Sequence, residues 1–263
     1  MSGFSAEWLA LREPADVEAC AEAVSRHVAE ALAGRSSVRV VDLGSGTGSN
    51  VRYLSSLLAG DAQWLLVDDE PALLAVAARS VPKQVETRVH DLRQLDTSLF
   101  AGCDFVTASA LLDLVSDRWL LALAERCRAA RAHVLFALNY DGRLHCTPAD
   151  ADDDLIRDAV NRHQRGDKGF GPALGPASGA RAVAVFSAAG YRIVRGQSDW
   201  DLGVAHEELQ RQLIGGWAAA ASEIAPRDAT RIEQWRRRRL AHVDGGVSRL
   251  VVGHDDVGGV FGR

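Results

Sequence analysis

Residues 38–50 read VRVVDLGSGTGSN, and this stretch decides the fold of the chain. It opens with an apolar run, Val38 to Leu43, of the kind that forms a strand covered on both faces. Glycines follow at alternate positions: Gly44, Gly46 and Gly48. Such glycines suit a turn that needs positive φ or a close approach of the backbone to a ligand. From Val51 the apolar residues recur at helical spacing, so the stretch predicts a buried strand, a tight turn and the start of a helix.

The turn ends at a helix N-terminus, whose free N–H groups can hold the polar or anionic part of a nucleotide-like cofactor. A dinucleotide-binding fingerprint would place its third glycine where this chain has Ser49. The chain instead reads Asp42-x-Gly44-x-Gly46-x-Gly48, which resembles the first motif of class I S-adenosylmethionine-dependent methyltransferases. The resemblance implies that the three glycines lie against the methionine part of the cofactor and that Asp42 orients this loop and the cofactor's amino group. An ordinary strand–turn–helix without a ligand is the alternative.

A second apolar run, residues 64–67, stops at Asp68 and Asp69, and Pro71 follows where a helix can begin. A carboxylate at the end of the second strand can accept hydrogen bonds from both ribose hydroxyls in a doubly wound sheet. The family register, an acid followed after two residues by proline, selects Asp68 as the ribose ligand and leaves Asp69 as a helix cap. Both aspartates acting as caps is the alternative.

Two further strand ends carry polar residues. The run 85–90 has the pattern of an edge strand and ends at Asp91 and Leu92. The resemblance implies that Asp91 binds the adenine amino group and that the N–H of Leu92 reaches a ring nitrogen; a solvated loop aspartate is the alternative. The run 103–109 ends at Ser109, and the family places the methionine moiety and the transferable methyl group beside this strand end.

The order of the apolar runs predicts an α/β fold. We expect a doubly wound, mostly parallel sheet of seven strands, preceded by a helix over 16–33, and the resemblance implies that the last strand is antiparallel. The last three strands are expected at 133–138, 191–198 and 248–253. Residues 1–263 then form a single methyltransferase domain. Within it, the segments 141–181 and 200–246 are expected to be mostly helical insertions that form lids over the cofactor.

Bulk properties exclude several classes of protein. The chain has 263 residues, 47% of them hydrophobic and 25% charged, as in an ordinary globular protein. Its net charge of -5 disfavours a nucleic-acid partner, and no apolar run is long enough to cross a membrane. The four cysteines form no C-x-x-C pair, so we expect no metal site and a reducing cytoplasm. The excess of arginine over lysine, with abundant alanine, indicates a GC-rich bacterial genome.

Catalytic residues are harder to predict. Methyl transfer from a sulfonium is a direct displacement, which needs an aligned nucleophile and help with removing a proton. The candidate groups are His163, Tyr140 and Asp113, and the other histidines considered are His145 and His206. His163 is preferred because it ends an expected helix just before the glycine-rich loop 166–176. Asp113 can instead support the turn after the fourth strand.

The sequence therefore predicts a methyltransferase that acts on a small molecule, with S-adenosylmethionine as donor and S-adenosylhomocysteine as product. Oxygen is the favoured acceptor atom, on family frequency. The tryptophans of the second insertion either line an acceptor pocket or form a core of their own: Trp200, Trp217 and Trp235. The alternatives are an RNA or protein methyltransferase, suggested by the basic run 236–239, an NAD-dependent oxidoreductase, and a subunit that binds the cofactor without catalysis. Nothing in the sequence indicates the oligomeric state.

Overall fold

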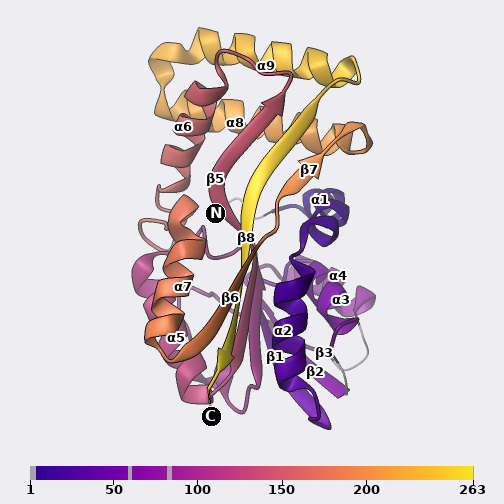
Figure 1. The fold of residues 1–263 in the computed structure, drawn as a ribbon, viewed down its shortest axis with the longest axis vertical. Helices are drawn as coiled ribbons and strands as arrows, with labels where there is room; N and C mark the ends of the chain where they lie inside the picture. The colour runs from indigo at the N-terminus through magenta and orange to yellow at the C-terminus, as the bar shows by residue number, and fades with distance from the viewer. Residues whose placement is uncertain (1–3, 59–60, 82–84, 263) are drawn as a thin grey trace.

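The computed structural model describes residues 4–58, 61–81 and 85–262. One sheet runs through the molecule in the order β3-β2-β1-β4-β5-β8-β6, and a short strand, β7, pairs with β8 (Figure 1). The strands are β1 (Ser37–Leu43), β2 (Asp61–Asp68), β3 (Val85–Val89), β4 (Phe105–Ser109), β5 (His133–Thr147), β6 (Tyr191–Gln197), β7 (Trp200–Leu202) and β8 (Arg249–Phe261). Strands β1 to β5 pair in parallel, and β8 runs antiparallel to each of its neighbours. The predicted doubly wound α/β fold with an antiparallel last strand is confirmed.

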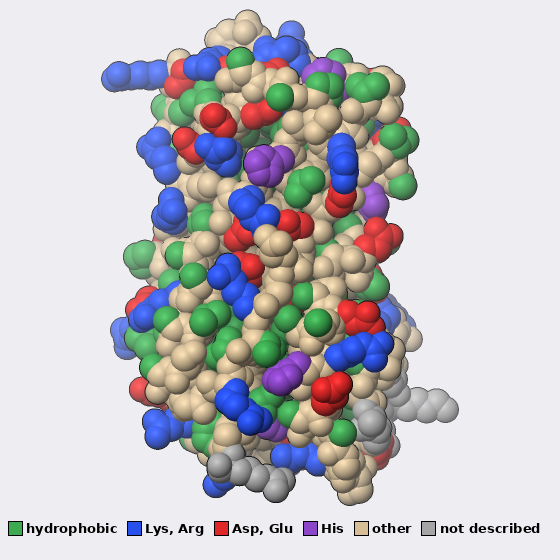
Figure 2. All heavy atoms as spheres, viewed as in Figure 1, with side chains coloured by type: hydrophobic (Ala, Val, Ile, Leu, Met, Phe, Trp, Pro, Cys, Tyr) green, Lys and Arg blue, Asp and Glu red, His purple; other side chains and the backbone are tan. Residues whose placement is uncertain are grey.

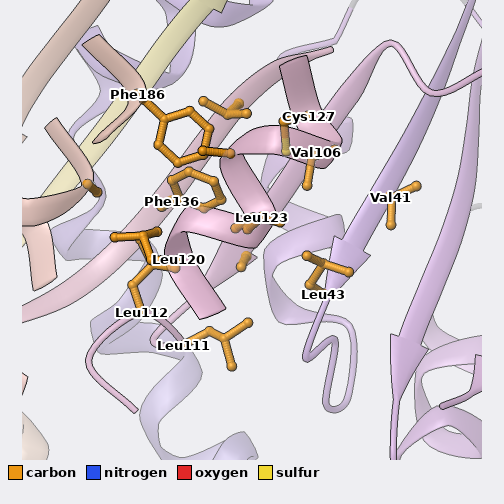
Figure 3. Packing of buried hydrophobic residues seen from close by; sticks show 14 of the residues in the cluster. Val41, Leu43, Val106, Leu111, Leu112, Leu120, Leu123, Cys127, Phe136 and Phe186 are labelled. Carbon is orange, nitrogen blue, oxygen red and sulfur yellow. The ribbon is translucent and has the colours of Figure 1, made fainter. Parts of the chain in front are cut away.

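Helices cover both faces of the parallel part of the sheet. The helices are α1 (Ala6–Ala19), α2 (Glu22–Leu32), α3 (Ser49–Ser55), α4 (Pro71–Ser80), α5 (Asp117–Ala130), α6 (Asp153–Gln164), α7 (Ser178–Ala188), α8 (Glu207–Ile224) and α9 (Ala229–Asp244). Helices α2, α3 and α4 bury their apolar side chains against one face, and α5 and α7 against the other. Figure 3 shows the second layer, where Phe136 of β5 lies beside Phe186 of α7 with ring centroids 5.1 Å apart.

The long strands β5 and β8 continue past the parallel sheet into an upper region that also holds β7, α6, α8 and α9 (Figure 1). A separate apolar core fills this region. Trp200, Trp217 and Trp235 are all buried in it. Of the two readings of these tryptophans, the core of the insertion is therefore the one that the structure supports.

Three expected boundaries are wrong. The segment 16–33 forms parts of two helices, α1 and α2, because the backbone N–H of Ala21 donates to Asp256 (2.9 Å) and leaves the helical ladder. The strand expected at 248–253 runs on to Phe261, and the strand expected at 133–138 runs on to Thr147. Since β7 adds a short eighth strand, the sheet has one strand more than predicted.

Glycine explains why β8 is longer than its sequence suggests. Gly258 and Gly259 resemble a turn, yet both lie inside the strand. A Cβ atom at Gly259 would lie 2.7 Å from Val134, and one at Gly258 would lie 2.9 Å from Val24 of α2. The two glycines therefore let a neighbouring strand and α2 pack directly against the backbone of β8.

A buried carboxylate joins β8 to the N-terminal helices. Asp256 is fully buried, and its two oxygens accept hydrogen bonds from the N–H groups of Leu138 (2.7 Å) and Ala21 (2.9 Å). Leu138 has a φ of +54° at an irregularity of β5, where the strand cannot offer its N–H to a regular ladder. One side chain thus satisfies the backbone at the bend of β5 and at the break between α1 and α2.

We expect Asp256→Ala to lower the free energy of unfolding by about 2–4 kcal/mol, because two buried N–H groups lose their acceptor. Urea unfolding measures this change. Asp154→Ala is the matched control, since the Asp154 side chain is 81% exposed and its ion pair with Arg157 contributes at most about 1 kcal/mol. Equal stability of the two variants would contradict the structural role of Asp256.

Candidate functional site

A cavity of about 250 Å³ lies at the carboxyl ends of β1, β2 and β4 and just beyond β3. Six of the eight predicted cofactor residues line it: Gly44, Gly46, Asp68, Asp91, Leu92 and Ser109. These residues come from four different strand ends, so the crossovers of the sheet bring together groups that are up to 65 positions apart in the chain. Ligands bind at this edge in open α/β sheets.

The glycine turn forms one wall of the cavity. Gly44 and Gly46 have φ angles of +69° and +51°, which a side chain would strain. The N–H of Gly44 donates to the carbonyl of Val67 on β2 (2.8 Å), and this bond holds the turn against the neighbouring strand. A Cβ atom at Gly46 would lie only 3.0 Å from Leu9. Bare main chain therefore faces the cavity at both positions.

Asp68 lies at the end of β2 with its carboxylate held by the backbone. Its oxygens accept from the N–H of Gly46 (2.8 Å) and the N–H of Glu70 (3.0 Å). Burial raises the pKa of Asp68, and these two hydrogen bonds oppose the rise. Each carboxylate oxygen retains a second lone pair, so ribose hydroxyls can still donate to it. The neighbouring Asp69 lines the cavity and caps no helix, so the expectation of a cap was wrong.

Asp91 is paired with Arg93 at the far end of the cavity. The guanidinium Nε lies 2.8 Å from both oxygens of Asp91, and these hydrogen bonds lower the pKa of the carboxyl group. The adjacent Leu92 is buried, and its carbonyl accepts from the indole of Trp119 (2.6 Å). An ionised Asp91 is an acceptor for an amino group.

Asp42 and Gly48 lie behind the cavity wall. Asp42 is 1% exposed, and its Oδ1 accepts from Asn50 (2.7 Å), which also donates to Thr107 (3.0 Å). The second oxygen of Asp42 has no hydrogen-bond partner among the described residues. Gly48 is the N-cap residue of α3, and a Cβ atom there would lie 2.7 Å from Val81. Asp42 therefore connects β1 to α3 and, through Asn50, to β4. Gly48 allows α3 to approach the end of α4. The predicted cofactor roles of both residues stay predictions.

Helix α1 covers the cavity, which the sequence did not predict. Leu9 and Arg12 of α1 line it, together with Phe4. Arg12 forms a bidentate ion pair with Asp16, whose Oδ1 also accepts from Trp200 (3.0 Å). The signal was present in residues 4–11, where Phe4, Trp8 and Leu11 are apolar and Ser5 caps the helix.

The three predicted catalytic groups do not line the cavity. Tyr140 donates to Asn161 (2.7 Å), and Asp113 is a buried carboxyl group whose Oδ1 has no partner among the described residues. Burial raises the pKa of Asp113 to about 6. His163 lies between Lys168 (3.3 Å) and Glu223 (3.2 Å). Their catalytic roles stay predictions, with Asp113 nearest in sequence to the cavity.

The predicted lids differ in their relation to the cavity. From the segment 141–181, Gly169 and Phe170 line it, as expected of a covering loop. In the described part of the chain, no residue of 200–246 lines it. That segment packs instead on the upper ends of β5 and β8.

Asp42 gives a prediction for the pH dependence of stability. Burial raises its pKa to about 7 from an ordinary value of 3.8, so between these values the folded state keeps a proton that the unfolded state has released. The native protein therefore loses stability as the pH rises through this range. Asp42→Asn removes the titration and keeps an oxygen that can accept from Asn50. We expect the variant to gain on the order of 2 kcal/mol relative to the native protein from about pH 5 to about pH 7.

Urea unfolding of both proteins at the two pH values measures this gain. A stability difference that does not change with pH would contradict the raised pKa of Asp42.

Comparison with known families identifies the segment that builds the cavity. Residues 40–133 match the family model of the methyltransferase domain. This segment runs from β1 to the first residue of β5 and contains all eight predicted cofactor residues. No curated protein matches the chain.

Solved structures share the fold at low identity. A candidate methyltransferase from Bacillus halodurans is 11% identical, with a TM-score of 0.50, and the match covers 91% of this chain and 100% of that one. A methyltransferase from Geobacter sulfurreducens in complex with S-adenosylhomocysteine is 15% identical, with a TM-score of 0.49 and full coverage of both chains. Phosphoethanolamine N-methyltransferase 2 from Haemonchus contortus is 14% identical, with a TM-score of 0.44; the match covers 91% of this chain and spans about half, 52%, of that one. Residues 40–133 are therefore similar to the methyltransferase domain, and the chain shares the fold of the Bacillus halodurans structure.

Proposed function

We propose that the protein transfers a methyl group from S-adenosylmethionine to a small-molecule acceptor and releases S-adenosylhomocysteine. The observation that carries this proposal is the convergence of six predicted cofactor residues on one cavity inside the segment that matches the methyltransferase domain. The bound donor would supply an electrophilic methyl group on a positively charged sulfur. The protein's part is to bind, to orient and to exclude water.

The cavity fits such a donor in shape and charge. Gly44 and Gly46 present main chain to the cavity, and Leu111 lies beside Gly44 in its wall. In the proposed complex Asp68 would hold the ribose, and Asp91 with the N–H of Leu92 would hold the adenine. Ser109 at the end of β4 lies where the methionine part would reach.

The acceptor would meet the methyl group between β4 and the covering segments. Leu111, Leu114 and Phe170 give this part of the cavity apolar walls, and Leu9 closes it from α1. Such walls suit an apolar or aromatic acceptor and keep water away from the displacement. We favour oxygen as the acceptor atom, on its frequency among methyltransferases of the class that the sequence resembles.

The basic run 236–239 supports a small acceptor over a nucleic acid. Arg236 and Arg237 pair with Glu233, Arg238 pairs with Asp150 and Asp152, and Arg239 is buried against Asp153. All four arginines therefore have acidic partners within the protein, and Arg238 and Arg239 attach α9 to the start of α6. On the face drawn in Figure 2, acidic and basic side chains are interspersed, without the continuous basic surface that a phosphate backbone requires.

A direct test separates the proposed donor from a nicotinamide cofactor. We expect isothermal calorimetry to detect saturable binding of S-adenosylhomocysteine and none of NAD at the same concentration, because Ser49 replaces the third glycine of a dinucleotide fingerprint. Binding of NAD alone would overturn the proposal.

Asp68→Ala should weaken the binding of S-adenosylhomocysteine by about 1–3 kcal/mol, since a charge-assisted acceptor for the ribose is lost. Asp61→Ala is the matched control, because Asp61 is an exposed aspartate at the opposite end of the same strand. Calorimetry on both variants measures the effect. An unchanged affinity for Asp68→Ala would reject the ribose role.

A further inference from the structure

A second depression adjoins the cavity on the side of α5. It has a volume of about 430 Å³ and shares Arg93, Gly169 and Phe170 with the cavity. The other residues that line it are Leu95, Ser116, Arg118, Trp119, Ala122 and Arg126. We call this depression the α5 groove. Phe170 lies between the groove and the cavity, and its ring packs edge-on against Trp119 with centroids 5.8 Å apart.

The α5 groove is lined by three arginines and no acidic residue. Arg93 is paired with Asp91, but neither Arg118 nor Arg126 forms an ion pair with any described residue. The Nε atom of Arg126 is buried and has no hydrogen-bond partner in the described chain. A buried donor without a partner has a free-energy cost that a bound acceptor would remove. In a chain of net charge -5, two unpaired arginines in one groove form a local positive site.

The spacing on α5 shapes this site. Residues 118, 122 and 126 are four apart, so they lie in one stripe along the helix. Ala122 stands between the two arginines and leaves room between their side chains. The groove also reaches Ser116, the residue that caps the N-terminus of α5, where the helix dipole favours an anion.

We propose that the α5 groove binds the phosphate group of a phosphorylated acceptor, whose other end passes Phe170 into the cavity. This inference rests on the proposed function and names the class of its substrate. Two guanidinium groups can offer a phosphate several charge-assisted hydrogen bonds in fixed geometry, which a monoanion of another shape would use less fully. The aromatic pair of Trp119 and Phe170 provides an apolar surface for the part of the acceptor between the phosphate and the reacting atom.

The test uses the full chain and titrates inorganic phosphate by calorimetry, at constant ionic strength, with S-adenosylhomocysteine present. We expect saturable binding that is at least tenfold weaker in the double variant Arg118→Gln/Arg126→Gln. Arg128→Gln is the matched control, because Arg128 is exposed on another face of α5 and should bind phosphate as the native protein does. Arg118→Lys/Arg126→Lys should restore part of the binding, which shows that charge is what the double variant lost.

Equal phosphate binding by the native protein, the double variant Arg118→Gln/Arg126→Gln and the control Arg128→Gln would overturn the proposal. A single-stranded RNA 12-mer is the second arm: RNA binding that depends on Arg118 and Arg126, without phosphate binding, would also overturn it in favour of a nucleic acid. S-adenosylhomocysteine affinity is measured in each protein. If the protein binds S-adenosylhomocysteine but not phosphate, only the proposal for the α5 groove is rejected. If it binds phosphate but not S-adenosylhomocysteine, the proposed function is rejected.

Discussion

The carboxylate of Asp256 is the interaction on which the position of the cavity's cover depends. It binds the N–H of Leu138 at the bend of β5 and the N–H of Ala21 at the break between α1 and α2. This break separates α1 from α2. With it, α1 turns across the strand ends, where Leu9 lies above Gly46 and the ion pair of Glu13 with Arg52 attaches α1 to α3. A buried carboxyl group in β8 therefore contacts the junction between α1 and α2, more than 200 positions earlier in the chain.

The sequence predicted the strand ends well because each signal is local. An acid or a run of glycines directly after an apolar strand is a feature of a few neighbouring residues, and parallel strands place such features at one edge of the sheet. Helix α1 and the full length of β8 were missed for the opposite reason. The break at Ala21 depends on its hydrogen bond to Asp256. The glycines of β8 allow α2 and β5 to pack directly against the backbone of this strand. Neither cause is visible within a short window of sequence.

The catalytic candidates illustrate the same limit. His163 was selected because it precedes a glycine-rich loop, yet its neighbours are Lys168 and Glu223, and Glu223 lies 60 positions away on α8. Asp113 was given a structural alternative, and in the structure it is a buried carboxyl group between the cavity-lining residues Leu111 and Leu114. Chemical type and local spacing identify which residues can exchange protons. Which of these residues are held by other side chains, and so kept away from the cavity, depends on how distant segments pack.

The charges around the site are separated in a way that fits the two proposals together. Within the cavity, the cations are already matched, Arg12 by Asp16 and Arg93 by Asp91, whereas Asp68 and Asp69 have no cationic partner among the described residues. The cavity is therefore negative, which favours a positively charged sulfonium over its neutral product. The α5 groove has the opposite sign, since Arg118 and Arg126 are unpaired. A cationic donor and an anionic acceptor would then each be drawn to its own side of Phe170, and their mutual attraction would favour the approach of the nucleophile to the methyl group.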